Sequence, residues 1–268
     1  MTGTDRITRA FRRARDERRL AFVPYITAGD PDLDGTRRLT AALAGAGADV
    51  LELGVPWIRP TVDGPVMPRK RTHLPGSSMS LDALLTSLPV IKSGADIPMV
   101  LSCDLESILE LGEEVFAERA AAAGADGVLL ADAPGPRLER ARSALEARGI
   151  ATVFLVTPDS SEKHLQAIPR SSGGFVHVAS PLFLDNDDLA RKSLLDLAAR
   201  LREQTRLPVA LGLGVSTAKQ VSGLCGAADA FVAGNALETI VDRLGAGDEG
   251  IVAVATLARK LSAACREA

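Results

Sequence analysis

The sequence predicts a single α/β domain over residues 1–268 with the (β/α)8 TIM-barrel fold, in which helices enclose a barrel of parallel strands. The first reason is size and composition, because 268 residues, 46% of them hydrophobic, can bury one large core. The second is that short β-branched runs alternate with Ala-, Leu- and Arg-rich stretches of helical period. The third is that eight such β/α units at this chain length are typical of a closed parallel barrel. An open, doubly wound sheet is the alternative.

Eight segments have the composition of buried strands, and they are distributed along the whole chain. They are LAFVPYITAG from residue 20, ADVLELGVP from 48, IPMVLSCD from 97, DGVLLADAP from 126, ATVFLVTP from 151, GFVHVAS from 174, PVALGLGVS from 208 and AFVAG from 230. Helices are expected between them, and several of these stretches end at a Gly, as helix C-termini often do. Residues 1–19 are expected to form an N-terminal helix, and residues 248–268 a closing amphipathic helix.

One connection is longer than the others. The starts of the second and third predicted strands are 49 residues apart, whereas the other spacings run from 22 to 34. The excess lies in WIRPTVDGPVMPRKRTHLPGSSMS, directly after the strand that carries Glu52. Loops on that side of a β/α barrel form its active face, so this loop is a candidate for function.

Charge and cysteine content argue against several classes of function. With 31 basic and 34 acidic residues and a pI near 5.7, the chain gives no electrostatic reason to expect binding to nucleic acid or to an anionic membrane. Cys103, Cys225 and Cys265 are too few and too scattered for a disulfide framework or a metal cage. The charged N-terminus lacks the apolar core of a signal peptide, and no segment is long enough to span a bilayer. A cytoplasmic protein with a small polar partner is therefore expected.

Glu52 is the most unusual residue of the predicted strands, because an ionised carboxylate is rarely buried without a partner. Side chains alternate along LELGVP, so Leu51 and Leu53 share one face and Glu52 takes the other with Gly54. If the two leucines face the helices, Glu52 points into the barrel. Apolar walls would disfavour its charged form, which suits a group that exchanges protons near neutral pH. A glutamate paired to a barrel Arg or Lys is the alternative, and both interpretations stay open.

Asp63 follows in the long loop, within VDGP. This tetrapeptide is by itself an ordinary turn signal, with Asp placed to accept from its own backbone. If the loop closes over the barrel mouth, however, Glu52 and Asp63 supply two proton-handling groups on opposite sides of a bound substrate.

Two Gly-containing motifs mark the last two β/α units, GLGVST at 212–217 and AGNALE at 233–238. Gly lets the backbone approach a ligand, and free N–H groups at helix N-termini attract anions, so this is a common position for a phosphate site in a barrel. The candidates are Gly212, Gly214, Ser216, Gly234 and Asn235. Gly in tight strand-to-helix turns is the alternative.

Histidines are few, and they divide into two groups. His177 in FVHVAS is placed to project into the barrel, where it could contact a ligand, although a strand histidine that is hydrogen-bonded in the core is the commoner case. His73 and His164 have the pattern of surface residues.

Four motifs together carry a resemblance to a known family. The segments FVPYITAGDPD at 22–32, ELGVPWIRPTVDGP at 52–65, GVLLADAP at 127–134 and GLGVSTAKQV at 212–221 resemble the tryptophan synthase alpha chain over nearly the whole chain. The resemblance implies retro-aldol cleavage of indole-3-glycerol phosphate to indole and glyceraldehyde 3-phosphate, without a metal or an organic cofactor. It implies that Glu52 is the general acid/base, that Asp63 holds the indole N–H, and that Tyr25 lies in the substrate-binding site.

The chain departs most strongly from the family pattern at three places, and more mildly where Gly234-Asn235 replaces the family's Gly-Ser. PWIRP puts Arg59 where the family has an acidic residue linked to its β chain, which argues against that partner. SCDLES puts Asp104 where a tyrosine would line the indole pocket, so Asp104 is a candidate substrate contact. HVASPLFLDNDDLA puts Asp185, Asp187 and Asp188 where a Gly-rich phosphate loop is expected. These departures favour, as the alternative function, a diverged paralogue that is either an aldolase-like enzyme for another substrate or a non-catalytic barrel subunit.

Overall fold

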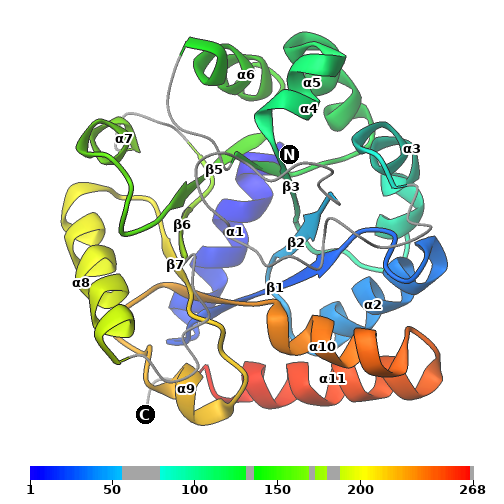
Figure 1. Cartoon of the computed structure of the whole chain (residues 1–268), viewed down its shortest axis with the longest axis vertical. Coiled ribbons are helices and arrows are strands. Elements are labelled where there is room, and N and C mark those ends of the chain that lie inside the picture. Colours follow the sequence, from blue (N-terminus) through cyan, green and yellow to red (C-terminus); the bar gives the residue numbers. More distant parts are fainter. Residues whose placement is uncertain (56–78, 131–135, 169–172, 180–187, 266–268) are drawn as a thin grey trace.

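A computed structural model describes residues 1–55, 79–130, 136–168, 173–179 and 188–265. Eight parallel strands form a closed barrel in chain order from β1 to β8 (Figure 1). Closure is direct, because Ala21 of β1 pairs with Ala230 of β8. The predicted (β/α)8 barrel is therefore confirmed and the open-sheet alternative is wrong. The strands are β1 Ala21–Thr27, β2 Leu51–Gly54, β3 Met99–Cys103, β4 Gly127–Leu130, β5 Ala151–Val156, β6 Val176–Ala179, β7 Val209–Gly212 and β8 Ala230–Ala233.

Helices surround the barrel and cover its outer surface, except for the first, which lies across one end of the barrel (Figure 1). They are α1 Gly3–Asp16, α2 Leu33–Gly45, α3 Leu81–Lys92, α4 Leu105–Leu111, α5 Glu113–Ala122, α6 Pro136–Glu146, α7 Glu162–Ala167, α8 Asp188–Gln204, α9 Ala218–Ser222, α10 Asn235–Leu244 and α11 Asp248–Ala263. The N-terminal helix is shorter than the predicted 1–19, because Arg18 adopts a positive φ of 51° that ends the helical path. The closing helix begins at Asp248, where predicted, but ends at Ala263 and not at residue 268.

Strand alternation divides the core into two layers. Leu51 and Leu53 belong to the outer layer, where strands pack against the enclosing helices. Val100 and Leu129 belong to the inner layer, which fills the barrel and includes the apolar face of α1. Phe11 of α1 contacts Phe175, with ring centroids 5.1 Å apart, so α1 closes the end of the barrel at which the strands begin. The opposite end, where the strands finish, is the end at which β/α barrels carry their active sites.

Aspartates fix the start of three strands in the same way. Asp49, Asp126 and Asp229 each precede a strand, and each carboxylate accepts from a backbone N–H on the preceding strand of the barrel, at 2.8 to 2.9 Å. Arg19 binds the Asp49 carboxylate at 2.6 Å, and Lys92 binds that of Asp126 at 2.6 Å. These carboxylates at the start of the strands thus have a structural role.

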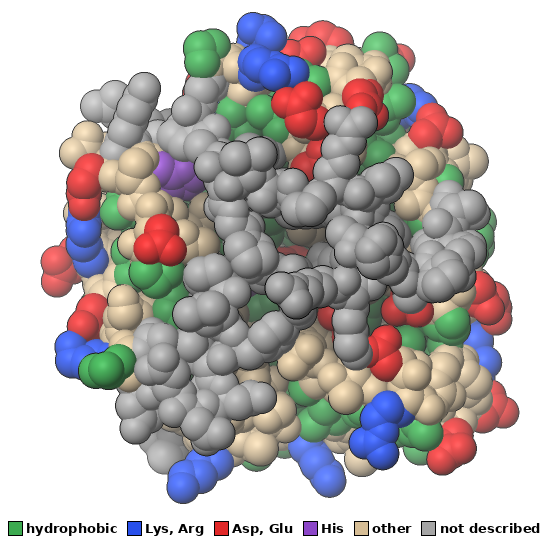
Figure 2. Space-filling model, in the orientation of Figure 1, with side chains coloured by type: hydrophobic (Ala, Val, Ile, Leu, Met, Phe, Trp, Pro, Cys, Tyr) green, Lys and Arg blue, Asp and Glu red, His purple; other side chains and the backbone are tan. Residues whose placement is uncertain are grey.

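The described surface carries mixed charge. Acidic and basic side chains are interspersed around the rim of the face in Figure 2, and no field of one sign gathers there among the residues that are described. None of the helices in those residues is both long and apolar enough to cross a membrane. Cys103, Cys225 and Cys265 are not joined in disulfides.

Candidate active site

Glu52 lies inside the barrel, two residues before Gly54, the last residue of β2. Leu51 and Leu53 face the helices, so alternation turns Glu52 inward as predicted, and the residue is only 1% exposed. Its neighbours in the sheet are Tyr25 on β1 and Val100 on β3. A carboxylate so placed has lost nearly all contact with water and needs compensation from the protein.

His177 on β6 faces Glu52 from across the barrel. Its Nδ1 lies 3.1 Å from Oε1 of Glu52, and its side chain is 6% exposed. The two atoms are within hydrogen-bonding distance without the alignment of a full hydrogen bond, and neither has another hydrogen-bond partner in the described part of the chain. The predicted inward projection of His177 is confirmed. The alternative for Glu52 is a barrel Arg or Lys as its partner, and within those residues a histidine takes that place.

Three glycines at the same end of the barrel make room for aromatic side chains. A Cβ on Gly54 would overlap the Tyr25 hydroxyl, and a Cβ on Gly234 would meet Tyr25 Cβ at 3.2 Å. A Cβ on Gly212 would meet Nε2 of His177 at 2.6 Å. Gly212 and Gly234, which the sequence proposes as phosphate ligands, therefore have a packing role in holding Tyr25 and His177. Tyr25 is fully buried, and its contact with substrate stays a prediction.

The remaining phosphate candidates differ in whether they have open space beside them and whether their polar groups already have hydrogen-bond partners. Gly214 adopts a φ of 66°, which favours glycine, and has open space beside it. The backbone N–H of Ser216 donates to Oε1 of Gln220 at 2.9 Å, and its hydroxyl lies 3.2 Å from the same oxygen, so both groups already have a partner. Asn235 opens α10, whose N-cap Gly234 supplies no side-chain hydrogen bond. Gly214 and the first turn of α10 are thus the groups best placed to accept an anion.

Asp104 has a local structural role. It is the N-cap of α4, and its two carboxylate oxygens accept from the backbone N–H and the hydroxyl of Ser107, both at 2.8 Å. Its predicted contact with substrate stays a prediction. Asp63, Arg59, Asp185 and Asp187 lie outside the described residues, as does His73, and Asp188 is the first residue of α8.

His164 corrects a prediction. The sequence pattern places it on the surface, but it is only 8% exposed, within the short helix α7. Burial disfavours the imidazolium form and lowers the pKa of His164 below its ordinary value, although a hydrogen bond with the Leu155 backbone opposes this shift. A six-residue helix carries too few positions for its apolar face to be recognised from sequence periodicity.

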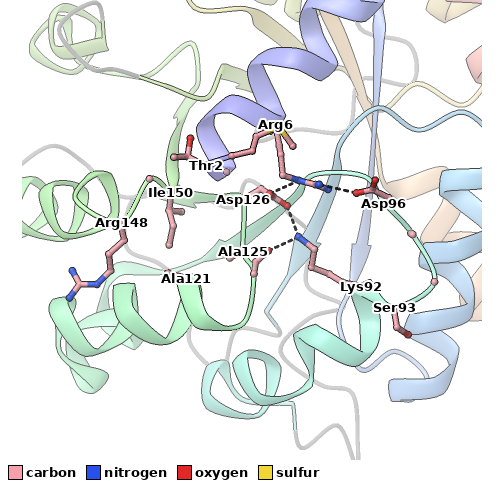
Figure 3. A pocket seen from close by; sticks show the side chains of 16 residues that line it. Thr2, Arg6, Lys92, Ser93, Asp96, Ala121, Ala125, Asp126, Arg148 and Ile150 are labelled. Carbon is pink, nitrogen blue, oxygen red and sulfur yellow. Dashed lines mark hydrogen bonds and ion pairs between the residues drawn. The ribbon is translucent and has the colours of Figure 1, made fainter.

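A cavity of about 660 Å³ lies at the opposite end of the barrel (Figure 3). Its walls include Arg6 from α1 and Asp126 from the start of β4. The cavity therefore lies at the end of the barrel where the strands begin. Figure 3 shows ion pairs in its wall between Arg6 and both Asp96 and Asp126, and between Lys92 and Asp126. Arg148, which also lines the cavity, pairs with Glu114, so the charged side chains of this lining already have partners. Across the described ranges, no group of three or more His, Cys, Asp or Glu could hold a metal ion.

Comparisons with known proteins agree on one family. The family model for the tryptophan synthase alpha chain matches residues 11–266. The tryptophan synthase alpha chain of Caulobacter sp. strain K31 is 36% identical over 98% of this chain and 97% of its own length, and that of Synechococcus elongatus is 35% identical over 95% of each.

Solved structures give the same result. A structure of Mycobacterium tuberculosis tryptophan synthase matches with a TM-score of 0.85 and 27% identity, over 98% of this chain and 99% of that one. The alpha subunit from Legionella pneumophila strain Paris matches with the same TM-score and identity, over 99% and 98% of the two chains.

Proposed function

The chain belongs to the tryptophan synthase alpha chain family, and from this premise we propose that Glu52 is the general acid/base of its reaction and that Asp63 is the second proton-handling group. The reaction is the cleavage of indole-3-glycerol phosphate to indole and glyceraldehyde 3-phosphate by a carbon–carbon lyase. The observation that carries the assignment is the position of Glu52: a carboxylate 1% exposed, inside the barrel and near the end at which the strands finish.

The chemistry explains why two carboxylates are needed. The bond between indole C3 and the glycerol side chain breaks when C3 takes up a proton and the neighbouring hydroxyl gives up its proton to become an aldehyde. Glu52 donates the first proton and accepts the second, so its protonation state is restored at the end of the turnover. Asp63, by resemblance, holds the indole N–H and stabilises the positive charge that develops on the ring when C3 is protonated.

The phosphate end of the substrate is assigned to Gly214 and the first turn of α10. Gly214 leaves open space, and the α10 N-terminus, which starts at Asn235, has no side-chain cap. Backbone N–H groups in such a position attract a phosphate through partial charge alone. Gly212 and Gly234 act indirectly, because they hold the side chains that border the site.

A β chain is the partner proposed for this subunit, because its relatives are named as alpha chains of tryptophan synthase. Arg59 replaces an acidic residue of the family motif, so we expect weak affinity for the β chain of a relative. Gel filtration of the mixed chains tests this: elution as separate chains is expected, with a complex formed by Arg59→Asp. Co-elution of the unaltered chain would show that Arg59 does not oppose pairing.

The activity is tested by following indole release from purified chain supplied with indole-3-glycerol phosphate or with the same compound after removal of its phosphate. Release from the phosphorylated compound, and much slower release from the other, is the expected result. Equal rates would contradict the phosphate assignment and favour the diverged paralogue with another substrate. No release from either compound, with or without a β chain, would favour the non-catalytic barrel subunit.

A further inference from the structure

Glu52 and His177 form an isolated polar pair in the barrel. Oε1 of Glu52 and Nδ1 of His177 are 3.1 Å apart, and the two side chains are 1% and 6% exposed. Around them the inner layer is apolar: Val100 neighbours Glu52 in the sheet, and Leu155 and Ala210 neighbour His177. In such surroundings a hydrogen bond to a carboxylate is stronger than it would be in water.

The two atoms have no competing partner. Both are buried, and neither makes another hydrogen bond within the part of the chain that is described. Two unsatisfied polar atoms at this separation need only a small ring rotation to form a hydrogen bond, and catalytic hydrogen bonds are often poorly aligned before substrate binds. The other titratable side chain beside Glu52 in the described sheet is Tyr25, on the neighbouring strand.

Gly212 on β7 leaves room for the Nε2 side of the His177 imidazole. Nε2 of His177 would lie 2.6 Å from a Cβ at position 212, so the ring occupies the space that a side chain there would fill. The Nε2 side of the ring thus lies where a residue 212 side chain would be, and its Nδ1 lies toward Glu52. The position of the ring is therefore set from two sides.

We propose that His177 is a positioning residue for Glu52, an inference that rests on the proposed role of Glu52 as the acid/base. A neutral imidazole with its proton on Nδ1 donates to Oε1 whether Glu52 is ionised or carries a proton on Oε2. Oε1 is thus engaged throughout turnover, and proton exchange with the substrate is confined to Oε2. His177 itself neither gains nor loses a proton.

Three substitutions at position 177 separate this role from packing. His177→Leu keeps much of the volume but removes the donor, so kcat should fall about 10- to 100-fold, the range expected for a lost hydrogen bond to a charged group, with KM nearly unchanged. His177→Asn places an amide nitrogen on Cγ, where Nδ1 is attached, and should retain most of the kcat. His177→Gln places its nitrogen one atom further out and should resemble His177→Leu.

A double-mutant cycle with Glu52→Gln supplies the decisive comparison. If His177 acts through Glu52, His177→Leu should cost little further kcat once Glu52→Gln has removed the group it positions. Gly212→Ala offers a second perturbation if His177→Leu does not fold: it should lower kcat by displacing the imidazole, and His177→Asn should relieve the effect.

Three outcomes would overturn the proposal: an unchanged kcat in His177→Leu, an equal loss in both Glu52 backgrounds, or a loss confined to KM. A different result, full activity in Glu52→Gln alone, would instead contradict the proposed function.

Discussion

At the scale of single residues, Glu52 and its partner differ in how far the sequence could predict them. The inward orientation of Glu52 follows from alternation along LELG, because neighbours on a strand point to opposite faces. The pairing with His177 could not be predicted in the same way, since β2 and β6 lie apart in the strand order and come together only through closure. A signal was present all the same: both residues are inward-facing polar side chains on otherwise apolar strands.

His164 gives a pH-dependent prediction at this scale. Burial lowers its pKa below the ordinary 6.5, so as pH falls through that value the unfolded chain binds more protons than the folded one, and the stability contributed by neutral His164 is lost. His164→Leu cannot take up this proton, so its free energy of unfolding should fall less than that of the parent between about pH 7.5 and about pH 5.5. Urea unfolding of both proteins at the two values measures the difference. An equal decrease in the free energy of unfolding of both proteins would show that His164 does not contribute to this pH dependence.

At the scale of elements, the strands were predictable and the ends of helices less so. All eight predicted strands are present because each is a short β-branched run between helical stretches. The stretch after β3 is less regular: α4 and α5 are separate helices, divided at Gly112 with a φ of 86°. A positive φ is a property of one glycine and leaves no periodic signal, so sequence alone does not place such a break.

The same limit applies to the site. Gly212 and Gly234 were expected at a phosphate because glycine permits close approach, and glycine does permit close approach here, but to His177 and Tyr25. The sequence correctly predicts that another group approaches these glycines closely. Which group does so depends on which strands the closed barrel brings together. Ser216 likewise has the expected donors, but Gln220, one turn further along the chain, accepts from its backbone N–H.

Substitution of Asp126 tests whether the aspartates at the strand starts stabilise the fold. Its side chain is 4% exposed and binds Lys92 and Arg6, so Asp126→Asn leaves two cations beside a neutral group and should lower the free energy of unfolding by about 3 kcal/mol. Asp96→Asn is the matched control: its side chain is 92% exposed and binds Arg6 at the surface, so little change is expected. Denaturant unfolding of the parent and the two variants measures these differences. Equal stability of both variants would contradict the proposed importance of the buried aspartate.

At the scale of the whole molecule, the barrel separates structure from chemistry. The end at which the strands begin is closed by α1 and held by buried aspartates with paired cations. The other end carries Glu52 and His177, together with Gly214 and the first turn of α10. Substitutions at the first end should therefore act on stability, and those at the second on turnover.

The most direct measurement of the central claim is kcat for indole release by Glu52→Gln, compared with the parent and with Glu139→Gln. Glu139 lies on the outer helix α6, half-exposed and paired with Arg142, so its substitution should leave turnover unchanged. Loss of a general acid/base in Glu52→Gln should lower kcat about 100- to 10,000-fold in a protein that still folds. Retention of the parental kcat in folded Glu52→Gln would contradict the claim that the buried carboxylate of β2 carries the protons of this reaction.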